Sequence, residues 1–276
     1  MNYSHSYHAG NFADVFKHAI LVSLIEALQR KESGFCYIDT HAGAGLYDLS
    51  SDTAQKSKEY KSGISLLLDQ SCHDNIMTYV NCVKKANPES ELRYYPGSPY
   101  IAHSLLRAQD RMVLSELHPS VYQTIKERFA HDKRVSTHRL DAYQSLKAFL
   151  PPKERRGLIL IDPPYEQQNE FSHLINTLPL ALKRFATGVY AIWYPIKDRP
   201  PIERFYQELK KLIEQPMLIA ELCIYPESSA QHLNGCGMLI INPPWQLDKQ
   251  INGYLPQLWS TLSQKAWGQQ RLFALT

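Results

Sequence analysis

The chain has 276 residues, 44% hydrophobic and 21% charged, which is typical of a globular protein with a full core. Its net charge of +3 is compatible with a nucleic-acid partner, and its five scattered cysteines form no CxxC pair, which argues against a disulfide framework and a thiolate zinc site. The first ten residues have no apolar run, and no stretch approaches the ~18 apolar residues that span a bilayer. We therefore expect a soluble, cytoplasmic protein with no membrane partner.

The first predicted elements have the order that begins a nucleotide-binding α/β sheet. Apolar residues at helical spacing predict an amphipathic helix over 14–29, and 35–38 reads as a short buried strand. The strand leads into the small-residue loop Asp39-Thr-His-Ala-Gly-Ala-Gly45. A buried strand followed by such a loop is typical of the cofactor half of a Rossmann-like domain.

The segment 47–95 differs in character from its surroundings. It is polar and lysine-rich, with helix-like patches at 64–68 and 76–83. We interpret it as an inserted helical subdomain, so that residues 1–46 and 96–276 form one Rossmann-like domain. Ser98-Pro99 then begins a helix, with a cap residue followed by proline in the first turn.

Strands and helices alternate over most of the remaining chain. Strands are predicted at 111–116, 135–140, 157–161 and 189–193, and helices at 119–130, 142–150, 171–185 and 202–213. This alternation indicates a mostly parallel sheet covered by helices on both faces. Two consecutive strands, 217–225 and 237–241, indicate an antiparallel closing hairpin.

Asp162-Pro163-Pro164-Tyr165 follows the apolar strand 157–161, at the sheet edge where such folds bind ligands. An exocyclic aromatic amine is a poor nucleophile, because its lone pair is delocalised into the ring. The Asp162 carboxylate and the Pro163 carbonyl can accept hydrogen bonds from its two N–H groups. The two prolines restrict the backbone and so keep these acceptors in place. Tyr165 offers a face for stacking on an extruded base. The pattern favours methylation of such an amine, although a proline pair after a strand can also be only a stiff turn.

A second stretch of the same type serves as a comparison. Asn242-Pro243-Pro244-Trp245 follows the strand 237–241, and it fits the same acceptor-Pro-Pro-aromatic pattern. This strand reads as the last one of the antiparallel hairpin, so its end points away from the cofactor edge. We therefore assign a structural role to Asn242.

Residues for a nucleotide-like cofactor follow the strands in order. Gly43 and Gly45 let the backbone approach a ligand. Glu116, at the end of the second strand, can bind ribose hydroxyls, and Asp141, after the third strand, can accept a hydrogen bond from an adenine amine. Taken singly, each carboxylate is as well explained as a helix cap. His41 in the loop and His18 in the first helix can reach a cofactor carboxylate. Their spacing does not favour a metal site.

Together these residues resemble one family, the RlmJ-type 23S ribosomal RNA adenine-N6 methyltransferases. The resemblance covers essentially the whole chain, and its longest runs lie at 3–11, 14–18, 37–45, 93–99, 114–119, 155–165 and 184–188. Runs of this length are far more specific than a tetrapeptide.

The resemblance implies a class I methyltransferase fold with a helical insertion, S-adenosylmethionine as cofactor, and protein-free 23S rRNA as the substrate. It implies Asp162 as the catalytic acceptor and Tyr3 as an RNA contact. The implied cofactor contacts are His18, His41, Ser98, Glu116, Asp141, Ala142 and Asp162. Ala142 stands where the family commonly has glycine, a small change that keeps a backbone contact.

Two other functions remain open from the residues alone. The same loop serves DNA adenine-N6 methyltransferases, and a non-catalytic RNA-binding protein could share the scaffold. The basic residues Lys153, Arg155 and Arg156 could line an RNA path, or could be a solvated charge cluster.

Overall fold

The computed structural model describes residues 5–89, 91–166, 169–226, 233–263 and 267–275. Its centre is an eight-stranded sheet in the order β10-β8-β9-β7-β6-β1-β4-β5. In chain order these strands are β1 (Cys36–Asp39), β4 (Arg111–Ser115), β5 (Val135–His138), β6 (Gly157–Ile161), β7 (Val189–Ile196), β8 (Met217–Cys223), β9 (Gly235–Ile241) and β10 (Gln269–Ala274).

The sheet is parallel except for β9 and β10, as the register of each neighbouring pair shows. The predicted hairpin of β8 and β9 is confirmed, with Met217 opposite Ile241. Its placement as the end of the sheet is wrong, because β9 lies between β7 and β8 and β10 follows as the edge strand. The residues of β10 are exposed or half-buried, so they lack the apolar pattern that marks the other strands.

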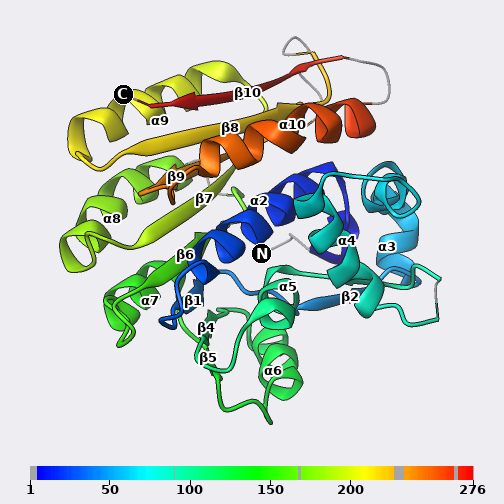
Figure 1. The fold of residues 1–276 in the computed structure, drawn as a ribbon, viewed down its shortest axis with the longest axis horizontal. Coiled ribbons are helices and arrows are strands. Elements are labelled where there is room, and N and C mark those ends of the chain that lie inside the picture. The colour runs from blue at the N-terminus through cyan, green and yellow to red at the C-terminus, as the bar shows by residue number, and fades with distance from the viewer. Residues whose placement is uncertain (1–4, 90, 167–168, 227–232, 264–266, 276) are drawn as a thin grey trace.

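Helices cover both faces of this sheet (Figure 1). Alternate residues of β6 show why: Leu158 and Leu160 join one hydrophobic cluster, whereas Ile159 and Ile161 join the other. The first cluster includes α2 (Phe12–Gln29), α5 (Ser98–Leu105), α6 (Pro119–Arg128) and α10 (Leu247–Ser263). The second includes α7 (Ala142–Phe149), α8 (Glu170–Arg184) and α9 (Arg199–Leu212).

Helix α2 is buried along almost its whole length, and only Glu26 and Gln29 are partly exposed. The sequence predicts a helix with one apolar face here. The structure buries the other face as well, because α4 (Asp74–Lys85) and α10 pack on it. Asn11 caps the first turn by accepting from the amides of Ala13 and Asp14, both at 3.0 Å.

The segment 47–95 leaves and rejoins the main domain at one point. Its ends form the two-stranded antiparallel sheet of β2 (Leu46–Asp48) and β3 (Tyr94–Pro96). Between them lie α3 (Asp52–Ser57), the 3-10 helices η1 (Glu59–Ser62) and η2 (Ile64–Leu67), and α4. Ile76, Tyr79 and Val80 of α4 share the hydrophobic cluster of α2, so this segment packs against the domain and buries its apolar residues there.

The structure adds a short N-terminal helix, α1 (His5–His8), which the sequence pattern does not predict. It contacts α3 across the start of α2. Within the described part of the chain, no helix is both long and apolar enough to cross a membrane.

Candidate active site

Four carboxylates lie at one edge of the sheet because they end or follow adjacent parallel strands. Asp39 ends β1, Glu116 follows β4, Asp141 follows β5 and Asp162 follows β6. The order β6-β1-β4-β5 places these strand ends side by side. The structure therefore brings together three of the expected cofactor residues, and adds Asp39, which the sequence reading left in the loop without a role.

The glycine loop adopts a backbone that residues with a side chain rarely take. Gly43 and Gly45 have φ values of +62° and +76°. A Cβ at Gly43 would lie 2.3 Å from the Tyr47 hydroxyl oxygen, and one at Gly45 would lie 2.7 Å from Ile125 Cδ1. The Gly43 amide donates to Glu116 Oε2 at 3.0 Å, so the carboxylate after β4 holds the loop after β1.

Asp39 is fully buried, and it forms no ion pair with any residue that the structure describes. Its carboxylate accepts from the hydroxyls of Tyr37 and Ser98, both at 2.7 Å, and from the His41 amide at 3.2 Å. Burial raises the pKa of Asp39 to about 6, although these hydrogen bonds oppose the shift. One carboxylate thus fixes both the loop after β1 and the start of α5, where Ser98 lies.

His41 is held in its neutral form, because burial lowers its pKa to about 4. The Thr40 hydroxyl lies 3.1 Å from the Leu160 carbonyl oxygen and 2.9 Å from His41 Nδ1, so it orients the imidazole ring next to the glycine loop.

Asp141 acts as the N-cap of α7. Its Oδ1 accepts from the amides of Tyr143 at 3.0 Å and Gln144 at 3.1 Å. Ala142 is the first residue of that helix and is buried. The capping role that the sequence left open is therefore present, and Oδ2 is the carboxylate oxygen not used by the cap.

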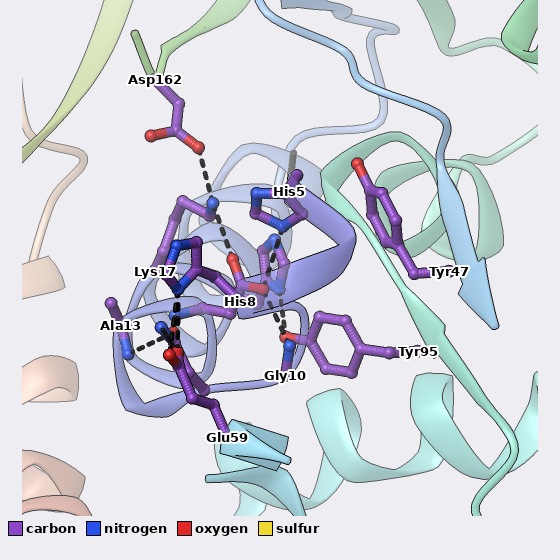
Figure 2. A network of polar contacts seen from close by, with 12 residues as sticks. His5, His8, Gly10, Ala13, Lys17, Tyr47, Glu59, Tyr95 and Asp162 are labelled. Atoms are coloured by element: carbon purple, nitrogen blue, oxygen red, sulfur yellow. Dashed lines mark hydrogen bonds and ion pairs between the residues drawn. The ribbon is translucent and has the colours of Figure 1, made fainter. Parts of the chain in front are cut away.

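Lys17 of α2 reaches across to the loop after β6, as Figure 2 shows. Its Nζ lies 2.5 Å from Asp162 Oδ2 and 2.9 Å from Asp14 Oδ1, and it lies 5.9 Å from the centre of the Trp193 ring. Burial opposes the charge, but the two carboxylates outweigh it and raise the pKa of Lys17 well above its usual range. Asp162 thus has a buried ammonium as partner.

The N-terminal helix is tied to the same region by two histidine contacts (Figure 2). His5 Nε2 lies 3.1 Å from Asp14, and His8 Nδ1 lies 3.0 Å from Glu59. Asn11 also donates to Glu59, at 2.9 Å. Residues 5–11 are therefore fixed near Lys17.

His18 is buried beneath this region. Its Nδ1 lies 2.7 Å from the Tyr95 hydroxyl, which in turn contacts the Tyr79 hydroxyl at 3.0 Å. Burial and the neighbouring Lys17 lower the pKa of His18 well below its usual value. Its Nε2 is buried with no hydrogen-bond partner among the residues that the structure describes.

Tyr165 packs inward in this structure. Its hydroxyl donates to the Trp193 carbonyl at 2.8 Å, and its ring centre lies 5.2 Å from that of Phe171 and 5.9 Å from that of Trp193. Its φ of +52° is unusual for a residue with a side chain. Pro163 is buried beside it. Tyr3, the expected RNA contact, lies outside the described residues.

Asn242 lies at the opposite edge of the sheet. Because β9 is antiparallel to β7, its end meets the start of β7. The Asn242 amide donates to the carbonyls of Ala186 and Gly188, both at 2.8 Å, which stabilises its φ of +57°. Its structural assignment agrees with this placement.

The basic residues before β6 also lie at that opposite edge. Arg156 Nη2 donates to the Leu28 carbonyl at 2.6 Å and Nη1 to Ser33, so this guanidinium caps the C-terminus of α2. Lys153 and Arg155 are exposed. Any RNA that these three residues contact is about 20 Å from the catalytic loop, the length of the intervening strand.

Sequence reasoning missed two parts of the site, Lys17 and the buried network of Asp39. The signal for Lys17 is Asp14 three residues before it, a charged pair inside an otherwise apolar helix. No comparable signal marks the Asp39 network. Tyr37 alternates with it on one strand, but Ser98 is 59 residues away and only the fold brings it near.

The residues of this edge fit S-adenosylmethionine. The glycine loop has no room for a Cβ, carboxylates follow β4 and β5, and His18 Nε2 is a buried polar atom still to be satisfied. Within the described ranges, no group of three or more His, Cys, Asp and Glu is arranged to hold a metal ion.

Numbered within the main sheet, the strand order reads 3-2-1-4-5-7-6-8. This order, with a glycine loop after the first strand and Asp-Pro-Pro-Tyr after the fourth, defines a class I, Rossmann-like methyltransferase. The model of the family described as ribosomal RNA large subunit methyltransferase D, RlmJ, matches residues 32–275. The chain belongs to this family.

Known proteins similar to the chain support this assignment over its whole length. The ribosomal RNA large subunit methyltransferase J of Haemophilus influenzae is 46% identical over 270 residues, 97% of this chain and 96% of that protein. The protein of the same name from Escherichia coli K12 is 45% identical and covers 95% of this chain and 94% of its own. A crystal structure of a Legionella pneumophila protein, 35% identical, covers 97% of both chains with a TM-score of 0.87.

Proposed function

We propose that the protein transfers the methyl group of S-adenosylmethionine to N6 of a single adenine in protein-free 23S rRNA, in the cytoplasm. The observation that carries this is the position of Asp162, which follows β6 next to the glycine loop of β1. Membership of the large-subunit rRNA methyltransferase family supports rRNA as the substrate.

When bound, the cofactor supplies an electrophilic methyl group. The chain's part is to orient the amine so that its lone pair, which is delocalised into the ring, becomes localised on the nitrogen and faces the methyl group. The Asp162 carboxylate accepts a hydrogen bond from one N–H of the amine, and the Pro163 carbonyl accepts one from the other. These two hydrogen bonds localise the lone pair. Acceptors held in place before reaction stabilise the transition state without reorganisation.

Lys17 positions this acceptor. Its Nζ contacts one oxygen of Asp162 and is itself held by Asp14, so the carboxylate is fixed from the side of α2. A carboxylate has two acceptor oxygens, so Asp162 can accept from both the lysine and the amine.

Methylation with labelled cofactor tests the substrate. We expect label in protein-free 23S rRNA and N6-methyladenosine in its nucleoside digest, at one position that mass spectrometry can map. Genomic DNA offered in parallel is expected to stay unlabelled. Label in DNA alone would overturn the proposal, and label at several adenines would overturn the single target.

A further inference from the structure

Trp245 is an unusual residue for the surface of this protein. Its side chain is 82% exposed, the largest value among the exposed large hydrophobic residues of the described chain. It belongs to the Asn242-Pro243-Pro244-Trp245 loop, which has no part in the proposed catalysis. A single exposed apolar side chain is common on protein surfaces, so the surroundings of Trp245 decide whether it marks a binding site.

The loop that carries Trp245 is held in a conformation that is unfavourable for its residues. Asn242 and Gln246 both have positive φ, +57° and +61°. The Asn242 amide group bonds two carbonyls before β7, and Arg30 Nη1 donates to the Trp245 carbonyl at 2.9 Å. Such contacts fix the indole before any partner binds, which lowers the entropy cost of binding.

The surroundings of this loop are basic. Five residues at the same sheet edge define what we call the basic rim: Arg30, Lys31, Lys153, Arg155 and Arg156. Lys249 at the start of α10 adds a sixth. The acidic side chains around them are Glu26, Glu32, Glu154, Glu214 and Asp248, and Glu154 is paired with Arg111 at 3.1 Å. The six basic groups outnumber the four acidic groups that are not paired with Arg111, which suits a polyanion.

The catalytic edge is more mixed in charge. It collects Asp39, Glu116, Asp141 and Asp162, and its exposed cations are Arg128, Arg139 and Lys197. Affinity for RNA comes largely from cations that meet phosphates. A basic surface away from these carboxylates is expected to add phosphate contacts to those at the catalytic edge.

We propose that Trp245 and the basic rim form a second RNA-binding surface, on which an unpaired nucleotide of the substrate rRNA stacks against the indole. The inference rests on the proposed rRNA substrate. The seven residues of β9 span about 23 Å, so this surface binds a part of the RNA distant from the target adenine. Binding here raises the local concentration of the RNA at the catalytic edge.

Steady-state methylation and direct binding, both with protein-free 23S rRNA, test this proposal. In Trp245→Ala the KM for RNA is expected to rise about tenfold, the effect of losing one stacked base, with kcat at saturating RNA retained. Trp245→Phe keeps a stacking ring and is expected to recover most of the affinity. Leu180→Ala removes another exposed apolar side chain, from α8, and serves as the control.

A second variant separates charge from stacking. Lys31→Glu with Arg155→Glu is expected to weaken RNA binding and to flatten its dependence on salt, because fewer counterions are released. Binding is followed by quenching of tryptophan fluorescence, which needs no turnover. Quenching by RNA is expected to be smaller in Trp245→Phe than in the wild-type protein.

Equal KM and equal quenching in wild type and Trp245→Ala would overturn the proposal. So would a change of sedimentation in Trp245→Ala at unchanged KM, which would assign the indole to a contact between protein copies. Failure of the proposed function gives a different result, since the wild-type protein would then leave 23S rRNA unlabelled, while the binding titration still reports on Trp245.

Discussion

At the scale of single residues, the same tetrapeptide pattern occurs twice with different surroundings. Asp162 has a buried ammonium partner and lies next to the glycine loop. Asn242 bonds only backbone carbonyls, at the other edge of the sheet. Their neighbours therefore separate a carboxylate that we propose accepts from the substrate from an amide group that donates to the backbone of the fold.

Alanine at each position should therefore have different effects. Asp162→Ala is expected to lower kcat by at least about a hundredfold, the usual effect of losing one preorganised polar contact, while Lys17 keeps Asp14 as partner and the fold survives. Asn242→Ala is expected to lower the unfolding free energy by about 2 kcal/mol but to retain turnover. Single-turnover rates and denaturant unfolding measure the two effects. Loss of activity in Asn242→Ala alone would contradict the assignment.

Asp39 gives a second prediction at this scale, because its pKa is near 3.8 in an unfolded chain and about 6 when buried. Between these values the folded protein binds more protons, so the contribution of Asp39 to stability falls as pH rises from about 4 to about 6, by up to about 3 kcal/mol. Asp39→Asn mimics the neutral form. The unfolding free energy of wild type minus that of Asp39→Asn is expected to decrease across this range, whereas parallel profiles would show that Asp39 is charged at little cost.

At the scale of elements, residues at the strand ends serve both the fold and the site. Asp141 caps α7 with one carboxylate oxygen, and Glu116 holds the Gly43 amide. Loops at the carboxyl ends of parallel strands are also helix starts, so a cap and a ligand contact can come from one side chain.

Two substitutions at Asp141 separate these roles. Asparagine keeps a capping oxygen, so Asp141→Asn is expected to stay close to wild type in stability, while Asp141→Ala loses about 1 kcal/mol. Both are expected to weaken binding of S-adenosylhomocysteine, because the acceptor for an adenine amine is altered in each. Thermal unfolding and calorimetry measure the two properties. Unchanged ligand affinity in both variants would leave Asp141 as a cap only.

At the scale of the whole molecule, the proposed cofactor site joins loops from β1, β4, β5 and β6 with α2. A ligand bound there contacts segments that only the folded chain brings together, so it stabilises the native state alone. The inserted segment is one more part that only the folded chain brings to the site, because it covers α2, which carries Lys17 and His18.

S-adenosylhomocysteine at about 100 times its Kd is expected to raise the unfolding free energy by about 2.7 kcal/mol, or Tm by roughly 5–10 °C. Differential scanning calorimetry measures this shift. ATP carries the same adenine and ribose without the amino-acid part, and it is expected to give little change. An equal shift with ATP would argue for a general nucleotide site.

The sequence by itself determined the alternation of strands and helices, the glycine loop and the acceptor loop, because periodicity and turn residues act over a few positions. It also determined the family, through long runs of matching residues. It did not reveal β10, whose half-exposed residues have no strand pattern, or the burial of α2 on all sides.

The order of the predicted strands already assigned the Asp162 loop, rather than the Asn242 loop, to the edge of the glycine loop. The tertiary structure added the position of β9 between β7 and β8. It alone paired Lys17 with Asp162 and Ser98 with Asp39, contacts 145 and 59 residues apart along the chain. It also placed the basic residues before β6 beside Trp245 and away from Asp162. Such long-range proximity follows from strand order and packing, which no local pattern encodes.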